Sequence, residues 1–143
     1  MVTLPAATST FVYVAPAVVG IAAGFLELIF VHEDEPGMGW LSHGLHALPF
    51  CLLFSYLSMN IGYVYKLLNL GFTSNMMYDL GIRAVIGLLA AFKIKAAAAV
   101  TKGHGSIGEK LPHALAIGFL IAAAPYVWPM IATIKAIPPI LKK

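Results

Sequence analysis

All five histidines of this chain lie in or beside two short polar segments, which separate its first two and its last two hydrophobic runs. The same segments hold four of the six acidic residues. Imidazole and carboxylate groups bind transition metals and exchange protons, so this is where the sequence concentrates reactive side chains. The histidines are His32, His43, His46, His104 and His113, and the acidic residues are Glu33, Asp34, Glu35 and Glu109.

A transition-metal site is one interpretation of this cluster. His43 and His46 are three residues apart at the start of a hydrophobic run, so a helix would present both on one face. His113 opens another run, and Glu33, Asp34, Glu35 and His104 are further candidate ligands. No spacing typical of zinc sites is present. The alternative interpretation is a set of interfacial histidines that hydrogen-bond to water, lipid headgroups or a partner subunit.

A haem site is a second interpretation, because His46 and His113 would face each other from neighbouring helices as axial ligands. The acidic run at Glu33 is equally consistent with a solvated loop. The sequence contains no nucleophile elbow, phosphate-binding loop or paired-carboxylate motif, so we predict no catalytic residue. We predict no cofactor either, and keep haem or a transition metal as the alternative.

The elements that must position these residues are hydrophobic enough to cross a bilayer. The chain has 143 residues, of which 60% are hydrophobic and 10% charged, whereas soluble domains carry about 25% charged residues. A membrane-spanning helix needs about 20 apolar residues. Four segments qualify: 11–31, 45–68, 80–100 and 113–137. We therefore expect an all-α integral membrane protein, a four-helix up-down bundle forming one domain over residues 1–143.

Details of the segments refine this expectation. Asn69 is a typical residue to end a helix, so the second span should stop there. A shift of 69 residues superimposes Ala47 on Ala116 and Phe50 on Phe119, so two tandem helical hairpins are an alternative organisation. Basic residues favour the side that holds both termini. The positive-inside rule then places the termini in the cytoplasm and the histidine-rich loops outside.

Two sets of residues inside the spans have predicted contacts. Gly20 and Gly24 form a GxxxG pattern, which lets helix backbones approach closely in lipid. Glu27 should lie at the same depth as Lys93 and Lys95, because the first and third spans run in the same direction. A charge at that depth is costly unless it is paired or reaches water. We therefore predict an intramembrane ion pair between Glu27 and one of these lysines, within one chain or between subunits.

The functional expectation follows from this architecture. The net charge of +3 is small and scattered, so no nucleic-acid binding is indicated. We expect a non-enzymatic structural subunit whose partners are membrane lipids and either further copies of the chain or other membrane subunits. In architecture alone, without a shared motif, it resembles the building units of lipid-associated filaments such as conjugative pilins, and small accessory subunits of membrane complexes. The alternatives are a redox or metal-binding subunit that uses the histidines, and a small oligomeric transporter or channel.

Overall fold

The structure, a computed structural model, describes residues 10–34, 40–70, 75–101, 110–133 and 138, and for residues 40–45 and 98–101 it describes the backbone alone. All regular structure in these residues is α-helical, which confirms the predicted all-α class. The helices are α1 (Val14–Asp34), α2 (Trp40–Met59), α3 (Ile61–Leu67), α4 (Met76–Thr101) and α5 (Leu111–Ala132).

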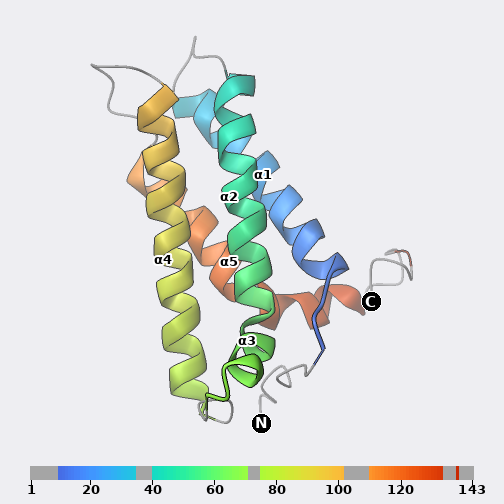
Figure 1. Ribbon diagram of the computed structural model, residues 1–143. Coiled ribbons are helices and arrows are strands. Elements are labelled where there is room, and N and C mark those ends of the chain that lie inside the picture. The colour runs from blue at the N-terminus through green and yellow to red at the C-terminus, as the bar shows by residue number, and fades with distance from the viewer. Residues whose placement is uncertain (1–9, 35–39, 71–74, 102–109, 134–137, 139–143) are drawn as a thin grey trace.

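The four long helices run alternately up and down, and the short α3 lies below α2 (Figure 1). Helix α1 packs against α2 and α5, and α4 packs against the same two helices. Helices α1 and α4 therefore occupy opposite corners of the bundle. We call the end where α1 and α4 stop and α2 and α5 start the histidine end. The other end, where α4 starts, is called the arginine end after Arg83.

Two of the described helices, α1 and α5, are long and apolar enough to cross a membrane. Helices α2 and α3 add a third crossing if this bent pair is one span. The sequence predicts four spans, so the structure supports two or three of them. The remaining helix, α4, carries Arg83, Lys93 and Lys95, and these basic residues lower its hydropathy.

The second predicted span, 45–68, is two helices in the structure, α2 and α3. Their axes differ by 62°, and Asn60 lies between them. The Asn60 side chain is buried, and its Oδ1 accepts a hydrogen bond of 2.6 Å from the Val12 backbone N–H. Its Nδ2 donates to the carbonyl oxygens of Val12 and Tyr56, both at 3.0 Å. The amide therefore satisfies its own polar atoms by holding the segment before α1 against the bend.

The end of α3 follows the sequence prediction for Asn69. This residue has a φ of 52°, in the left-handed region that asparagine tolerates better than most residues. The backbone N–H of Asn69 donates to the Lys66 carbonyl at 3.2 Å, and that of Leu70 donates to the Tyr65 carbonyl at 2.8 Å. This pair of bonds is a Schellman motif, which satisfies the last carbonyls of the helix.

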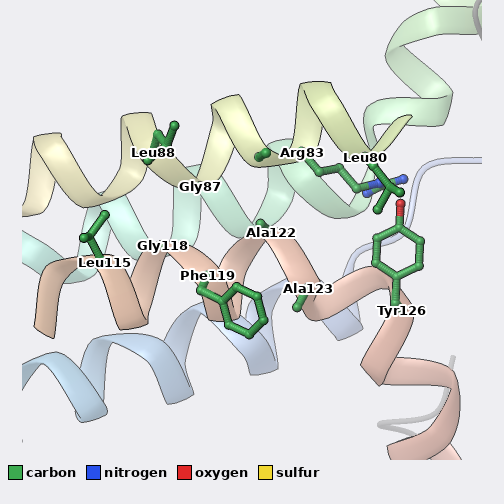
Figure 2. Close-up of a pocket in the computed structure, with 11 residues that line it drawn as sticks. Leu80, Arg83, Gly87, Leu88, Leu115, Gly118, Phe119, Ala122, Ala123 and Tyr126 are labelled. Carbon is green, nitrogen blue, oxygen red and sulfur yellow. The ribbon is translucent and has the colours of Figure 1, made fainter. Parts of the chain in front are cut away.

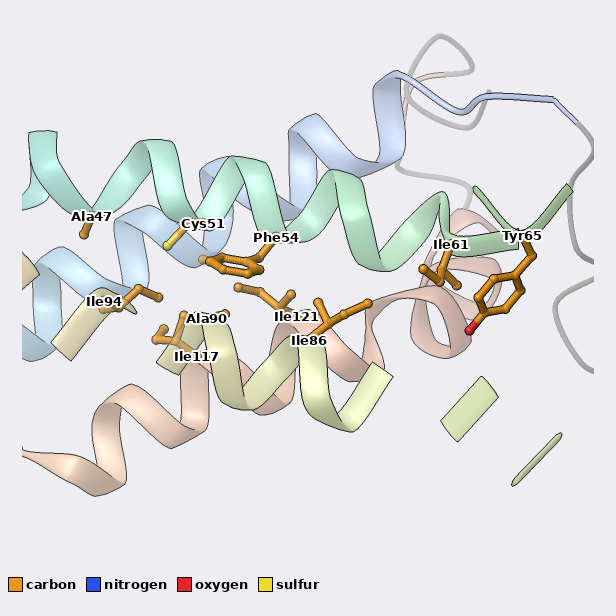
Figure 3. Packing of buried hydrophobic residues seen from close by; sticks show 11 residues of the cluster. Ala47, Cys51, Phe54, Ile61, Tyr65, Ile86, Ala90, Ile94, Ile117 and Ile121 are labelled. Carbon is orange, nitrogen blue, oxygen red and sulfur yellow. The ribbon is translucent and has the colours of Figure 1, made fainter. Parts of the chain in front are cut away.

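The core is a row of buried side chains along the axis of the bundle (Figure 3). Cys51 lies in it with no exposed surface. Most residues of this row are alanine or isoleucine, and the small alanines let the helices approach closely. Its members are Ala23, Ala47, Cys51, Phe54, Ile61, Tyr65, Ile86, Ala90, Ile94, Ile117 and Ile121.

Glycines lie at two of the closest helix contacts. The predicted pair Gly20 and Gly24 faces α2, where a Cβ added to Gly20 would lie 2.8 Å from the Cα of Leu52. A Cβ added to Gly24 would lie 2.5 Å from Cδ1 of Leu48. Between α4 and α5, a Cβ added to Gly87 would lie 2.5 Å from the carbonyl oxygen of Gly118. Both contacts therefore depend on the missing side chains.

Candidate functional site

Asp34, the last residue of α1, is the centre of the polar contacts at the histidine end. Its side chain is only 1% exposed. Its Oδ2 accepts a hydrogen bond of 2.9 Å from the backbone N–H of Lys110, and its Oδ1 lies 2.8 Å from the Lys110 Nζ. Lys110 is the residue that caps the start of α5. The carboxylate therefore lies at the positive end of the α5 dipole, which stabilises it.

His113, in the first turn of α5, completes this site. Its Nδ1 lies 2.7 Å from Oδ2 of Asp34. Because an ionised carboxylate only accepts hydrogen bonds, this contact places the proton of the imidazole on Nδ1. The ring also stacks on Phe30 of α1, with centroids 4.4 Å apart and an angle of 13° between the planes. The orientation of the imidazole is thus fixed by two residues of the neighbouring helix.

This arrangement can do two things chemically. A carboxylate that holds Nδ1 leaves Nε2 of a neutral imidazole as an acceptor, which is how proteins prepare a histidine for metal binding or proton transfer. A metal site needs further ligands, and the described residues contain no group of three or more His, Cys, Asp or Glu side chains that would supply them. The contacts that the structure does show join α1 to α5.

The described contacts of this site involve Asp34, Lys110, His113 and Phe30. Glu33 and His46 are exposed at the histidine end. For His43 only the helix backbone is described, and His104 lies outside the described residues. The structure therefore brings His113 together with Asp34, one of several candidate ligands in the sequence. It gives no distance between His46 and His113, so the haem interpretation stays a hypothesis.

Glu27, the acidic member of the predicted ion pair, is buried in the structure. Glu27 has no exposed surface and lies on the face of α1 that also carries Gly20 and Gly24. Lys95 is half-buried and Lys93 is exposed. Since α1 and α4 occupy opposite corners, a pair within one chain must cross the interior of the bundle, and this favours Lys95 as the partner. The pair itself stays a prediction.

The arginine end holds a second polar network, which the sequence analysis did not identify. Nε of Arg83 lies 2.8 Å from Oδ2 of Asp79, one turn earlier on α4. Nη1 of Arg83 donates to the carbonyl oxygen of Ser58 on α2, and the Tyr126 hydroxyl of α5 donates to Oδ2 of Asp79. The guanidinium also lies over the Tyr126 ring, 5.4 Å from its centroid. The four-residue spacing of Asp79 and Arg83 is typical of an ion pair on a helix, but nothing in the sequence indicated that Tyr126 would join them.

A groove between α4 and α5 begins at this network. It encloses about 530 Å³, and Arg83 and Tyr126 meet at one end of it (Figure 2). Glycines and alanines form its floor, and larger apolar side chains form its walls. The lining residues are Leu80, Arg83, Ala84, Gly87, Leu88, Leu115, Gly118, Phe119, Ala122, Ala123 and Tyr126.

Comparison with known proteins gives no relative: the chain matches no protein-family model, no curated protein and no solved structure.

Proposed function

We propose that this protein is a non-enzymatic structural subunit of a larger membrane or lipid-containing helical assembly. The observation that carries the proposal is that polar side chains at both ends of the bundle join one helix to another. Asp34 joins α1 to α5 through Lys110 and His113. Arg83 joins α4 to α2. In the described part of the chain, the side chains of Asp34, His113 and Arg83 are thus engaged in contacts between helices.

The outer surface supports the same proposal. Exposed apolar side chains follow one face of α1 at intervals of four residues, opposite the face that carries Gly20 and Glu27. A similar stripe runs along α4. Such surfaces are stable in lipid or against other helices, and in water they would promote aggregation. The stripes consist of Ile21, Phe25 and Ile29 on α1, and Val85, Leu88, Leu89 and Phe92 on α4.

Within this proposal, all four long helices cross the bilayer as one up-down domain. The termini lie in the cytoplasm, and the histidine end lies outside. Helix α4 completes the fourth crossing, since its two described neighbours α2 and α5 partly enclose it. The contacts are most extensive within α1–α2 and within α4–α5, which supports two hairpins. The duplication itself gains no support, because Ala47 is buried and its counterpart Ala116 is exposed.

Cross-linking in native membranes tests the proposal. Cys51 is the only cysteine of the chain and is buried, so the unmodified protein is a matched control that should not form a disulfide-linked dimer. Phe25→Cys and Phe92→Cys each place a thiol on an exposed stripe. We expect at least one of them to form dimers on oxidation, and the purified particle to contain several chains. A particle with the mass of a single chain, with neither variant cross-linking, would contradict the proposal.

A second candidate function, a metal- or haem-binding subunit, is favoured by the orientation of His113. Its Nδ1 is held by Asp34, which is the arrangement that orients a metal-ligating imidazole. Metal analysis and an absorption spectrum of the purified protein test this candidate. A stoichiometric metal or a Soret band that disappears in His113→Ala would favour it over the structural proposal. A metal or haem content unaffected by His113→Ala would count against it.

A further inference from the structure

The groove between α4 and α5 has one polar end, at Arg83 and Tyr126, and is apolar along the rest of its length. Measured along α5, it extends about 16 Å from Tyr126 to Leu115, at 1.5 Å per residue. Arg83 lies about 10 Å from the start of α4 on the same scale. If α4 begins near one membrane surface, the polar end of the groove lies at the boundary between headgroups and hydrocarbon, and the apolar end points toward the midplane.

The walls of the groove are hydrocarbon. Phe119 is 75% exposed and Leu88 is 48% exposed, although both line the groove. The floor is low because Gly87 and Gly118 meet there without side chains. These features match a flexible alkyl chain, which can follow an irregular apolar surface. A groove of about 530 Å³ is also within the size range of small-molecule sites.

The polar end matches an anionic headgroup. Arg83 is the basic residue that lines the groove, and it is paired with Asp79. The described charges of the arginine end as a whole, two basic residues and one carboxylate, leave one net positive charge. A guanidinium has five N–H donors. The Arg83 side chain is 7% exposed where it meets the groove, and its contacts with Asp79 and the Ser58 carbonyl occupy two of these donors in the described part of the chain. Arginine suits phosphate recognition because its planar fork donates more than one bond at once.

We infer that this groove binds an anionic phospholipid, with one acyl chain between Leu88 and Leu115 and the phosphate at Arg83. A helix from a second copy of the chain is the competing occupant, and the subunit number distinguishes the two. The inference does not depend on the assembly proposed above, because a single chain contains the whole groove.

Lipid retention during purification tests the inference. The full chain is reconstituted in nanodiscs that contain phosphatidylglycerol and phosphatidylcholine in equal amounts, then extracted into detergent. Native mass spectrometry counts the lipids that remain bound. We expect about one phosphatidylglycerol per chain and little phosphatidylcholine. Inorganic phosphate, added without lipid, should not raise the melting temperature, because it cannot occupy the apolar part of the groove.

A matched pair of variants separates the groove from the general lipid-facing surface. Ala84 is exposed and lines the groove, so Ala84→Phe should fill it without disturbing the core. Val85 is also exposed, on the next position of α4, but does not line the groove. Ala84→Phe should weaken lipid retention about tenfold or more, because the ring replaces several methylene contacts, while Val85→Phe should retain lipid as the unmodified protein does.

Three results would overturn the inference. The first is equal lipid retention in Ala84→Phe and Val85→Phe. The second is retention of phosphatidylcholine as strongly as phosphatidylglycerol, which would deny a site for the charge. The third is a change of subunit number, without a change of bound lipid, in Ala84→Phe. That last result would show that a second copy covers the groove. The first two results leave the assembly of the stripes untested, whereas the third concerns it directly.

Discussion

At the scale of single residues, Asp34 has two opposing positions. As the last residue of α1 it lies at the negative end of that helix's dipole, which is unfavourable. As the acceptor for Lys110 and His113 it lies at the positive end of α5, which is favourable. The contacts to α5 explain why a carboxylate that is only 1% exposed is tolerated there. Asp34 therefore stabilises the folded bundle through α5.

Replacing this carboxylate gives the first prediction. Asp34→Asn should lower the free energy of unfolding by about 2–3 kcal/mol, because charge-assisted hydrogen bonds in a buried position are lost. Most of the loss should come from His113 and the backbone N–H, since the Lys110 side chain is 66% exposed and its ion pair is screened.

Thermal unfolding in detergent, followed by circular dichroism, measures this loss. The matched control is Glu33→Gln, which neutralises the exposed neighbouring carboxylate and should change the free energy of unfolding by less than about 0.5 kcal/mol. If the two variants unfold at the same temperature, Asp34 does not hold α5 to α1.

The predicted pair of Glu27 with a lysine of α4 gives the second prediction. Glu27 is wholly buried, so Glu27→Lys should destabilise the protein by about 3–5 kcal/mol. Adding Lys95→Glu should restore part of that loss. Adding Lys93→Glu should restore less, because Lys93 is exposed and Lys95 is half-buried.

The same unfolding measurement, made on Glu27→Lys and on the two double variants, decides this prediction. Cross-linking or native mass then tells whether the restored pair lies within one chain or between chains. The prediction fails if neither double variant is more stable than Glu27→Lys alone.

At the scale of helices, the two glycine contacts differ in what opposes an added side chain. At Gly87 the opposing atom is the backbone carbonyl oxygen of Gly118, which cannot move without moving α5. At Gly81, on the same helix, a Cβ would meet nothing within 4 Å. The same substitution in one helix therefore tests packing against intrinsic helix propensity.

Gly87→Ala should destabilise the protein by about 1–3 kcal/mol, because the methyl group separates α4 from α5. Gly81→Ala should instead stabilise it by up to about 1 kcal/mol, since alanine favours the helix more than glycine does. Denaturation midpoints of the two variants provide the measurement. Equal effects with the same sign would show that the α4–α5 contact does not require Gly87.

The α1–α2 contact allows a finer comparison. A Cβ at Gly20 would meet the backbone of Leu52, whereas a Cβ at Gly24 would meet the end of the flexible Leu48 side chain. Gly20→Ala should therefore cost about 1–3 kcal/mol, and Gly24→Ala distinctly less, because Leu48 can change rotamer. A larger loss of stability for Gly24→Ala than for Gly20→Ala would contradict this packing.

The helices themselves could be predicted from the sequence, because long apolar runs specify them directly. The end of α3 was also predictable, since Asn69 favours the left-handed conformation that ends a helix. The bend at Asn60 was not, because its cause is the contact of that side chain with Val12, 48 residues earlier. The histidine end was predicted in part: the residue types were identified, but not the pairing of Asp34 with His113.

The network of Asp79, Arg83 and Tyr126 shows why the rest could not be predicted. Its members come from two helices whose relative rotation decides which side chains meet. Weak amphipathicity gives little information about that rotation, because apolar residues surround each helix. Gly87 and Gly118 carried the relevant signal, as small residues in hydrophobic runs. Other glycines and alanines in the same runs made that signal ambiguous.

At the scale of the whole molecule, the described charged residues other than Glu27, Lys93 and Lys95 are divided between the two ends. The described part of the histidine end holds Glu33, Asp34 and Lys110, and the arginine end holds Asp79, Arg83 and Lys66. The apolar stripes of α1 and α4 lie between them. A bundle with polar ends and an apolar middle fits a bilayer whose hydrocarbon core is about 30 Å thick. Helix α1, at 21 residues, is about 31 Å long and spans that distance.

This arrangement predicts the accessibility of single cysteines in intact cells. Glu33→Cys and Leu111→Cys place thiols at the end of α1 and the start of α5, both exposed, and Leu70→Cys places one after α3, also exposed. A maleimide that cannot cross membranes should label Glu33→Cys and Leu111→Cys in intact cells. It should label Leu70→Cys only after the membrane is permeabilised, because the positive-inside rule puts that end in the cytoplasm. Buried Cys51 in the unmodified chain reports background labelling.

Labelling of all three positions from the same side would show that the bundle does not cross the membrane. The reverse pattern, with Leu70→Cys alone labelled in intact cells, would keep the crossings and invert the orientation. If Glu33→Cys and Leu111→Cys were labelled from opposite sides, the contact of Asp34 with Lys110 and His113 could not exist in the membrane, and the up-down bundle would be wrong.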